Sequence, residues 1–245
     1  MKKILITGSS GQLGITLGKM FDSRYEIVST SSRISKRKNH HFLDITNAIL
    51  LKDVLKIIRP DMIINLAALT NVDLCELKPN FANTINFSGV QNLVNLFNGP
   101  IIQLSTDYVF DGDKGQYKEN DITNPKNEYG KTKLKAENFL INASKDSLVI
   151  RTNVLYDYSK HSPASFLSWV VSSLKKNQEV KIVNDQYNNP TWTNSLAVVI
   201  DKAIKINLSG IIHWGDYDYV SRFDFAIKIA EFFNLDKSLI KPIST

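Results

Sequence analysis

The glycine-rich turn after the first apolar run constrains the fold of this chain more than any other feature. Ile4-Leu5-Ile6 leads into Gly8-Ser9-Ser10-Gly11-Gln12-Leu13-Gly14, and a stretch with helical spacing, 13–21, follows. Glycine is needed where the backbone bends sharply, where it approaches a pyrophosphate and where a helix packs closely on a strand. The amino end of the helix offers unpaired N–H groups to phosphates. The turn therefore predicts a nucleotide-binding unit.

Strand-like and helical stretches alternate through the first 150 residues. The apolar runs, rich in β-branched residues, predict buried strands at 2–7, 25–30, 62–67, 101–106 and 147–152. Between them, helical spacing predicts helices at 13–21, 47–58, 81–97 and 129–141. Strands that alternate with helices imply right-handed crossovers, so we expect an α/β fold with a doubly wound parallel sheet of the Rossmann type.

The alternation loosens after residue 151. Helical patterns follow at 164–176, 195–206 and 222–233, with short strand-like runs at 180–183 and 210–214. We expect a dinucleotide-binding domain over 1–153 and a smaller substrate-binding lobe over 154–245, with the helix near 195–206 packing back on the first domain. In open α/β sheets the ligand lies at the carboxyl edge, so such a lobe would supply substrate contacts.

Composition excludes several classes of protein. The sole cysteine, Cys75, cannot form an intrachain disulfide, and the four histidines lack the spacing of metal ligands, so we predict no metal site and a reducing, cytoplasmic location. No stretch resembles a signal peptide or is long enough to span a bilayer. The formal charge of +6 is spread along the chain apart from 33–38, which argues against a nucleic-acid partner.

The end of the second predicted strand bears on the choice of cofactor. Many dinucleotide sites place an acidic residue there, whereas this chain has Ser31, Ser32 and Arg33, followed by a basic run at 36–38. Hydroxyls and cations suit a 2′-phosphate, which favours NADPH over NADH, although a solvated basic loop would have the same composition. Asp44 would hold the adenine edge or cap a helix from Thr46.

The fourth strand and the helix at 129–141 carry candidate catalytic groups. The strand ends at Ser105-Thr106, and Tyr129 and Lys133 share one helical face. Reduction of a ketone needs an acid that protonates the forming alkoxide, and an adjacent ammonium would lower the pKa of a tyrosine. Thr106 would then fix the substrate oxygen. The spacing of Tyr129 and Lys133 alone is common on solvated helices, so the indication comes from the combination.

With these motifs the sequence resembles the extended branch of the short-chain dehydrogenase/reductase superfamily, and within it the dTDP-4-dehydrorhamnose reductase-like family. The resemblance covers most of the chain. It rests on segments in the family's order and spacing: ITGSSGQLG from Ile6, RPDMIINLAALTNVDLCE from Arg59, INFSGVQNL from Ile85, LSTDYVFDG from Leu104, NPKNEYGKTKLKAE up to Glu137, VIRTNVLY at 149–156, VKIVNDQYNNPTWTNSLA at 180–197 and GIIHWG at 210–215.

The resemblance implies a role for particular residues. Thr106, Tyr129 and Lys133 would be catalytic, with Lys133 also on the nicotinamide ribose, Asn86 would support the site, and Arg151 would join the domains or form an ion pair. Cofactor binding would involve Gly8, Gly11, Gln12, Leu13, Gly14, Ser31, Ser32, Arg33, Asp44, Ala67 and Ala68, besides Tyr129 and Lys133. Substrate binding would involve Thr106, Asp107, Val109, Asn153 and Trp192.

The implied activity is NADPH-dependent reduction of a nucleotide-linked 4-keto-6-deoxy sugar in nucleotide-sugar and surface polysaccharide biosynthesis. Two departures bear on the substrate: Val154 stands where the family usually has a tryptophan that contacts the sugar, and the chain stops at Thr245, short of the usual family tail. Trp192 and Trp214 would supply aromatic contact instead, or pack in the core. The nucleotide, the sugar and the oligomeric state stay open, with a homodimer as one option.

Two alternatives remain within the same fold. A nucleotide-sugar dehydratase usually has a second acid where Tyr108 follows Asp107 here, which argues against water elimination, whereas an epimerase needs no such group. The regulatory subunit of methionine adenosyltransferase is also similar, and such a protein would keep the NADP site without turnover. The presence of Thr106, Tyr129 and Lys133 argues against that alternative.

Overall fold

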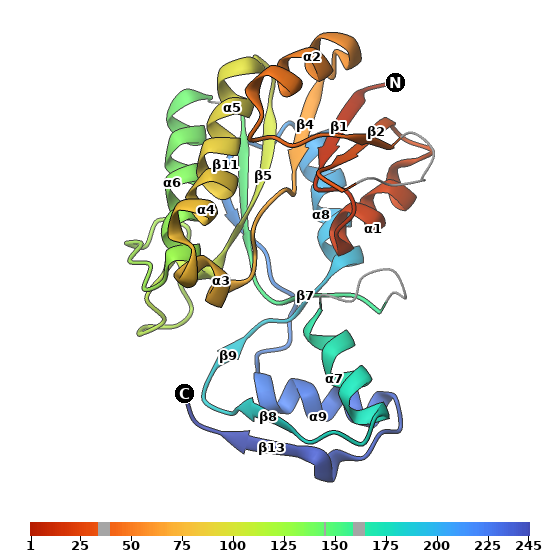
Figure 1. Ribbon diagram of the computed structural model, residues 1–245, viewed down its shortest axis with the longest axis vertical. Helices are drawn as coiled ribbons and strands as arrows, with labels where there is room; N and C mark the ends of the chain where they lie inside the picture. Colours follow the sequence, from red (N-terminus) through yellow and green to blue (C-terminus); the bar gives the residue numbers. More distant parts are fainter. Residues whose placement is uncertain (34–39, 145, 159–164) are drawn as a thin grey trace. The chain divides into compact units, whose positions relative to one another are not determined.

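The apolar runs of the sequence form one parallel sheet in the computed structural model of the chain (Figure 1). Its strand order is β11-β6-β5-β4-β1-β2-β3, and every pairing in it is parallel. The strands are β1 (Lys3–Thr7), β2 (Glu26–Ser31), β3 (His40–Phe42), β4 (Met62–Asn65), β5 (Ile101–Thr106), β6 (Leu148–Thr152) and β11 (Gly210–His213). The order reverses between β1 and β4, so the expectation of a doubly wound parallel sheet is confirmed.

The structure describes residues 1–33, 40–144, 146–158 and 165–245, which fall into two units. Unit 1 comprises Met1–Thr152 and Ala197–His213, and unit 2 comprises Asn153–Leu196 and Trp214–Thr245. The chain thus leaves unit 1 after β6 and returns to it within α8 (Thr193–Lys205).

Helices cover both faces of the sheet in unit 1 (Figure 1). They are α1 (Gln12–Phe21), α2 (Ala48–Ile58), α3 (Val72–Leu77), α4 (Pro79–Asn83), α5 (Gly89–Leu96), α6 (Glu128–Ala143) and α8. On one face, apolar residues of α2, α5 and α6, such as Leu51, Leu93 and Leu140, pack with Leu5 and Ile63 of the sheet. Burial of this surface is the main favourable contribution to the stability of the unit.

The other face carries α1 and α8, whose contact is polar at one end. The Asp201 carboxylate of α8 accepts hydrogen bonds from the Tyr25 hydroxyl at 2.8 Å and the Arg24 guanidinium at 2.7 Å, both just beyond α1.

The segment predicted as one helix, 81–97, is divided into α4, a π-helical turn (Thr84–Ser88) and α5. Such wide turns are frequent at functional sites.

The strand-like run at 210–214 differs in position from the expectation. We expected it in the smaller lobe, but β11 pairs with β6, from Gly210 opposite Leu148 to His213 opposite Arg151. All five residues of β6 are buried, so without β11 this strand would expose an unpaired edge. Apolar runs of this length show that a strand exists, whereas its partner is decided by tertiary packing.

Unit 2 has its own core. Its elements are β7 (Leu155–Tyr156), α7 (Phe166–Lys175), β8 (Val180–Val183), β9 (Tyr187–Asn188), β10 (Thr191–Trp192), β12 (Val220–Ser221), α9 (Arg222–Phe232), a 3₁₀ turn (Lys237–Leu239) and β13 (Ile240–Ile243). Apolar residues of α7 and α9, among them Val170 and Ala230, pack with Val180 and Ile240 of the β8–β13 pair. The two-residue strands escaped the sequence analysis because alternation cannot be read over two positions.

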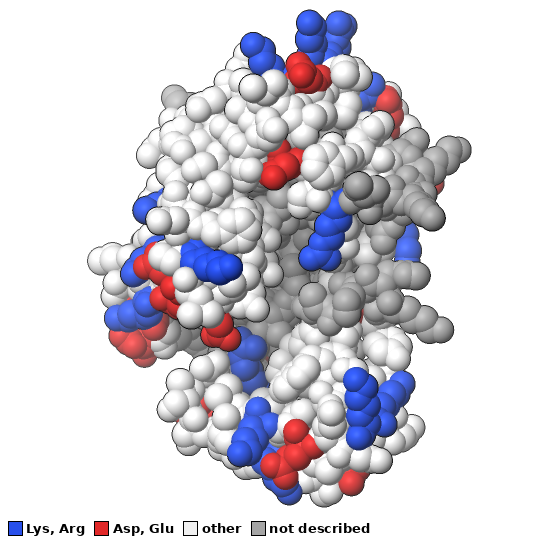
Figure 2. All heavy atoms as spheres, in the orientation of Figure 1, with Lys and Arg blue, Asp and Glu red and all other residues white. Residues whose placement is uncertain are grey.

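Acidic and basic side chains are interspersed on the face of each unit that Figure 2 shows, rather than segregated by sign. Within the described residues, no helix has both the length and the apolar character needed to cross a membrane.

Candidate active site

The candidate residues of unit 1 gather at the carboxyl edge of the sheet. The glycine-rich turn follows β1, Ser31 ends β2, Ala67 lies just after β4, and Thr106 ends β5. Because β2, β1, β4 and β5 are neighbours and parallel, these ends lie side by side. The edge between β1 and β4 is the point at which the strand order reverses, where open α/β sheets bind ligands.

Two glycines of the turn are required by close packing. A Cβ atom on Gly8, whose φ is +64°, would lie 2.6 Å from the backbone of Leu66 and Ala67. A Cβ on Gly14 would lie 2.5 Å from Cα of Ser9. Any side chain at these positions would force β1, the segment after β4 and the first turn of α1 apart.

The amino end of α1 fits a phosphate group. Gly11 is the N-cap without a side-chain cap, so the N–H groups of the first turn, at Gln12, Leu13 and Gly14, are available to a ligand. The Leu13 side chain is buried, and any ligand contact would come from its backbone. Within the described residues the buried Ser9 Oγ makes no hydrogen bond, and its hydroxyl can donate to a phosphate oxygen. Ser9 was missed by the sequence analysis.

Ser31, the last residue of β2, is hydrogen-bonded to the loop that follows it. The Ser31 hydroxyl donates to the Arg33 carbonyl at 2.9 Å and lies 3.0 Å from His40 Nε2, while Ser32 and Arg33 are exposed. The predicted basic residues Lys36, Arg37 and Lys38 lie outside the described residues. Asp44 does not cap a helix: it accepts bonds from the Thr46 N–H at 2.9 Å and the Thr46 hydroxyl at 2.7 Å, and the N-cap of α2 is Asn47.

Thr106 begins a tight turn at the end of β5. Its hydroxyl donates to Asp107 Oδ1 at 3.0 Å and accepts from the Tyr108 N–H at 3.2 Å. Its side chain also acts on Tyr129, whose pKa it lowers. Thr106 and Tyr129, which the sequence separates by more than twenty residues, are therefore in contact.

Helix α6 brings Tyr129 to this turn through two residues that the sequence analysis did not use. The Asn127 side chain caps α6 by accepting the Gly130 N–H at 2.8 Å, and a Cβ on Gly130 would lie 2.1 Å from the Tyr108 carbonyl oxygen. Only glycine permits this approach of α6 to the segment after β5. The rings of Tyr108 and Tyr129 meet edge to face at 6.0 Å.

The pKa of Tyr129 differs from the expectation. We expected the Lys133 ammonium to lower it, whereas burial, foremost, and the Asp107 carboxylate raise it above its ordinary value, against the hydrogen bond with Thr106. Lys133 is not among the groups that shift the pKa of Tyr129, and its Nζ donates to the Leu104 carbonyl of β5, at 2.6 Å. A protonated phenol at neutral pH is the form that can donate a proton to an alkoxide.

Lys133 is 3% exposed, and burial lowers its pKa to about 8, while Glu137 acts in the opposite sense. An ammonium has three donors, and Leu104 O is the acceptor that Nζ reaches within the described residues. The remaining donors can serve ribose hydroxyls, which fits the expected role of Lys133 toward a nicotinamide nucleotide.

Asn86 joins two parts of the site. It is 1% exposed and lies in the π-helical turn, where Oδ1 accepts the Leu69 N–H at 2.8 Å and Nδ2 donates to the Leu69 carbonyl at 3.1 Å and to Thr132 Oγ1 at 3.1 Å. It therefore ties the segment after β4 to α6 between Tyr129 and Lys133. This geometry is consistent with the support role expected of Asn86.

Arg151 forms a buried ion pair. Its guanidinium contacts the Glu137 carboxylate at 2.8, 3.1 and 3.3 Å, and the two side chains are 5% and 0% exposed. Nη1 also donates to the Glu119 carbonyl at 3.2 Å and lies 3.3 Å from His213 Nε2. Of the two roles considered for Arg151, this is the structural one.

The other residues expected to bind substrate, Val109, Asn153 and Trp192, differ in how far they are exposed. Val109 is fully buried and its carbonyl accepts the Asn124 N–H at 3.0 Å, so any ligand contact would come from its backbone. In unit 2, Trp192 is 44% exposed and Asn153 Oδ1 accepts from Thr191 at 3.4 Å. These two residues stay predictions.

Val154 has a strained backbone that the sequence did not reveal. Its φ is +34°, a region that is costly for a β-branched residue, by about 1–3 kcal/mol. Its carbonyl accepts the Thr191 N–H at 3.1 Å, beside the β7–β10 pairing that holds it. Trp214 is half-buried.

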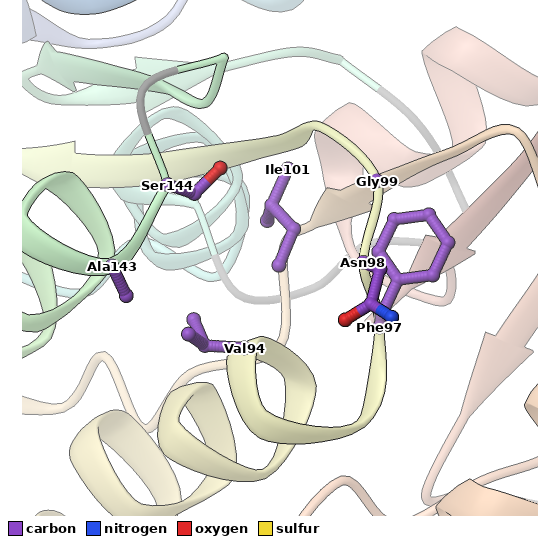
Figure 3. A pocket seen from close by; sticks show the side chains of 7 residues that line it. All are labelled: Val94, Phe97, Asn98, Gly99, Ile101, Ala143 and Ser144. Carbon is purple, nitrogen blue, oxygen red and sulfur yellow. The ribbon is translucent and has the colours of Figure 1, made fainter.

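A hollow in unit 1 lies away from this edge. Figure 3 shows it between the ends of α5 and α6 and the start of β5, lined by Val94, Phe97, Asn98, Gly99, Ile101, Ala143 and Ser144. The start of β5 is its amino end, opposite to Thr106.

Among the described residues, no group of three or more His, Cys, Asp or Glu side chains is placed to hold a metal ion, and His161 lies outside them.

The chain is similar over its whole length to known proteins. The family described as "RmlD substrate binding domain" matches residues 1–245. The dTDP-4-dehydrorhamnose reductase of Aggregatibacter actinomycetemcomitans is 37% identical over 94% of this chain and 78% of its own. The dTDP-4-dehydrorhamnose reductase of Bacillus anthracis, solved in complex with NADP, has a TM-score of 0.90 and 33% identity, covering 100% of this chain and 85% of its own.

A relative of another kind is similar to nearly the same extent. The methionine adenosyltransferase 2 subunit beta of Xenopus tropicalis is 29% identical over 99% of this chain and 75% of its own length.

Proposed function

Since the chain belongs to the dTDP-4-dehydrorhamnose reductase family of extended short-chain dehydrogenases/reductases, we propose that it reduces a nucleotide-linked 4-keto-6-deoxy sugar with NADPH. As a member of this family it is an NAD(P)-dependent oxidoreductase, and NADP is the cofactor of the solved relative from Bacillus anthracis. The observation that carries the proposal is the contact of Thr106 with Tyr129 beside the buried Lys133. We further propose that the product serves a surface polysaccharide or a related glycan.

Each residue of this group has a distinct task in the proposed reaction. The bound nicotinamide supplies a hydride to the carbonyl carbon, C4 of the sugar. The Thr106 hydroxyl, whose single proton turns from Asp107 to the carbonyl oxygen when the sugar binds, orients that oxygen by a hydrogen bond. Tyr129 gives its phenolic proton to the same oxygen as it becomes an alkoxide. The raised pKa of Tyr129 keeps this proton in place at neutral pH, and Lys133 holds the nicotinamide ribose.

The preference for NADPH is the finer part of the proposal. The exposed Arg33, two residues beyond the end of β2, supports it, because a guanidinium pairs well with a 2′-phosphate. Asn153 and Trp192 remain our candidates for contacts with the sugar nucleotide, and the Asp107 carboxylate is committed at least in part to Thr106.

The proposal is tested by following NADPH oxidation by the purified chain against a panel of 4-keto-6-deoxy sugar nucleotides, with NADH in parallel. NADPH-selective turnover of one of them is expected. Binding of NADPH with no oxidation on any member would instead favour an epimerase or a regulatory protein such as the methionine adenosyltransferase subunit.

The role of Tyr129 is tested with Tyr129→Phe. Loss of the proton donor should lower kcat by about two to four powers of ten and leave the dissociation constant of NADPH unchanged. Tyr25→Phe is the matched control, because it removes a hydroxyl that bonds Asp201 beside the amino end of β2, away from the carboxyl edge. Full activity of Tyr129→Phe would contradict the assignment.

A further inference from the structure

A row of buried polar side chains crosses the centre of the sheet. Thr7 of β1 pairs in register with Asn65 of β4, and Asn65 pairs with Gln103 of β5. The three side chains are 1%, 0% and 1% exposed. Apolar residues surround them along the same strands, so three neighbouring polar side chains at this depth are costly unless each is hydrogen-bonded.

The row is fully connected, and its donors all point one way. The Thr7 hydroxyl donates to Asn65 Oδ1, Asn65 Nδ2 donates to Gln103 Oε1 at 2.6 Å, and Gln103 Nε2 donates to the Leu104 carbonyl oxygen at 2.7 Å. The same oxygen accepts Lys133 Nζ at 2.6 Å. The row thus begins at the residue before the glycine-rich turn and ends at the acceptor of the candidate catalytic lysine.

The Leu104 carbonyl is reached by two side chains because of where β4 ends. The last residue of β4 is Asn65, and its register partner in β5 is Gln103. Leu104 lies one residue beyond this pairing. A carbonyl oxygen has two lone pairs, so the Gln103 amide occupies one of them and Lys133 takes the other.

We propose that Gln103 is a positioning residue for Lys133. Asn65 and Thr7 hold the Gln103 amide, which occupies one lone pair of the Leu104 carbonyl and so fixes the direction in which the lysine is bound. This inference rests on the role of Lys133 in the proposed function. Gln103 touches neither substrate nor cofactor in this assignment and acts through the Leu104 carbonyl. In surroundings of low polarity, each hydrogen bond of such a row strengthens the next one. The position of the last donor, Gln103 Nε2, therefore depends on the whole row.

The charges around Lys133 define what a change at Gln103 should do. Glu137, one turn further along α6, is the charged group that raises the pKa of Lys133, and it is itself paired with Arg151. The Gln103 amide N–H and the Lys133 ammonium both donate to the Leu104 carbonyl oxygen, so the amide competes with the ammonium for that acceptor. Gln103→Met keeps the volume and removes this donor. The ammonium should then be bound more strongly by Leu104 O, which favours its charged form.

The test is a pH titration of Lys133 by NMR in the cofactor-free protein carrying lysine labelled with ¹³C at Cε. The signal of Lys133 is the one absent from Lys133→Met, and it should titrate near pH 8 in the wild type. In Gln103→Met we expect its pKa to rise by about half a unit or more. We also expect kcat to fall by about tenfold with the KM for the sugar nucleotide within about twofold, because a displaced lysine misaligns the reacting groups.

Ser147→Ala is the control for loss of a buried hydrogen bond. Its hydroxyl accepts the Ile101 N–H at 3.0 Å at the opposite end of β5, and it is fully buried. This variant should leave the Lys133 titration unchanged. If Gln103→Met does not fold, Thr7→Val removes the first donor of the row without changing its shape, and a smaller upward shift is expected.

An unchanged or lowered pKa of Lys133 in the folded variant would overturn the inference and leave Gln103 a structural residue. The titration needs neither substrate nor cofactor. Failure of the proposed function, which is seen as absence of turnover, is therefore distinguishable from failure of this inference.

Discussion

Neutralising Glu137 should destabilise the fold strongly, because it removes the carboxylate that is hydrogen-bonded to the buried Arg151 guanidinium. The two side chains are 0% and 5% exposed, and three nitrogen–oxygen contacts of 2.8–3.3 Å join them. Breaking a buried pair from one side typically costs about 3–5 kcal/mol. Arg151 keeps the Glu119 carbonyl and the His213 ring as neutral partners, so we expect Glu137→Gln to cost about 3 kcal/mol.

The assay is urea denaturation followed by circular dichroism at pH 7.5, together with a melting curve. For a chain of this size about 3 kcal/mol corresponds to a fall in Tm of roughly 6–12 °C. Glu128→Gln is the matched control on the same helix, because its ion pair with Lys131 is 29% and 48% exposed. That variant should cost about 0.5 kcal/mol or less.

The reasoning also predicts the behaviour of a double variant. Glu137→Leu combined with Arg151→Met removes both members of the ion pair, and it should be less destabilised than Glu137→Gln, since the buried guanidinium is removed together with its partner. A free energy of unfolding for Glu137→Gln within about 1 kcal/mol of the wild type would refute the argument, because the guanidinium would then not depend on its partner.

Two further predictions concern the glycine-rich turn and pH. Gly14→Ala should abolish NADPH binding in a fluorescence titration and lower Tm, because its Cβ would lie 2.5 Å from Ser9. Gly18→Ala is the control on the same helix: its Cβ meets nothing within 4 Å, and the variant should stabilise the fold by about 0.5–1 kcal/mol. Equal NADPH binding by the two variants would count against the packing argument. Burial, opposed by the Glu119 charge, lowers the pKa of His213, so the unfolded chain takes up a proton near pH 6.5 that the folded chain resists. Stability should therefore fall as pH drops below about 6.5, and His213→Gln should lessen this loss in urea midpoints measured at pH 7.5 and 5.5; the same loss in both proteins would contradict it.

Local sequence determined the elements of unit 1 and most of the candidate site. The glycines at 8 and 14 had to be glycine for reasons of packing that hold for any strand–turn–helix of this kind, and the structure places a neighbouring backbone where their side chains would be. Tyr129 and Lys133 share a helical face by periodicity alone. Strands of five or six residues, nearly all of them buried, were visible because their apolar runs are continuous.

Tertiary structure decided what depends on contacts between distant segments. The pairing of β11 with β6, the burial that raises the pKa of Tyr129, and the ion pair of Glu137 with Arg151 join residues that no local pattern relates. The turn of Lys133 toward the Leu104 carbonyl likewise follows from the end of β4 on one side and the Gln103 amide on the other. Periodicity fixes which residues share a face, whereas a pKa or a hydrogen bond depends on burial and on the groups that face it, and these exist only once the chain has folded.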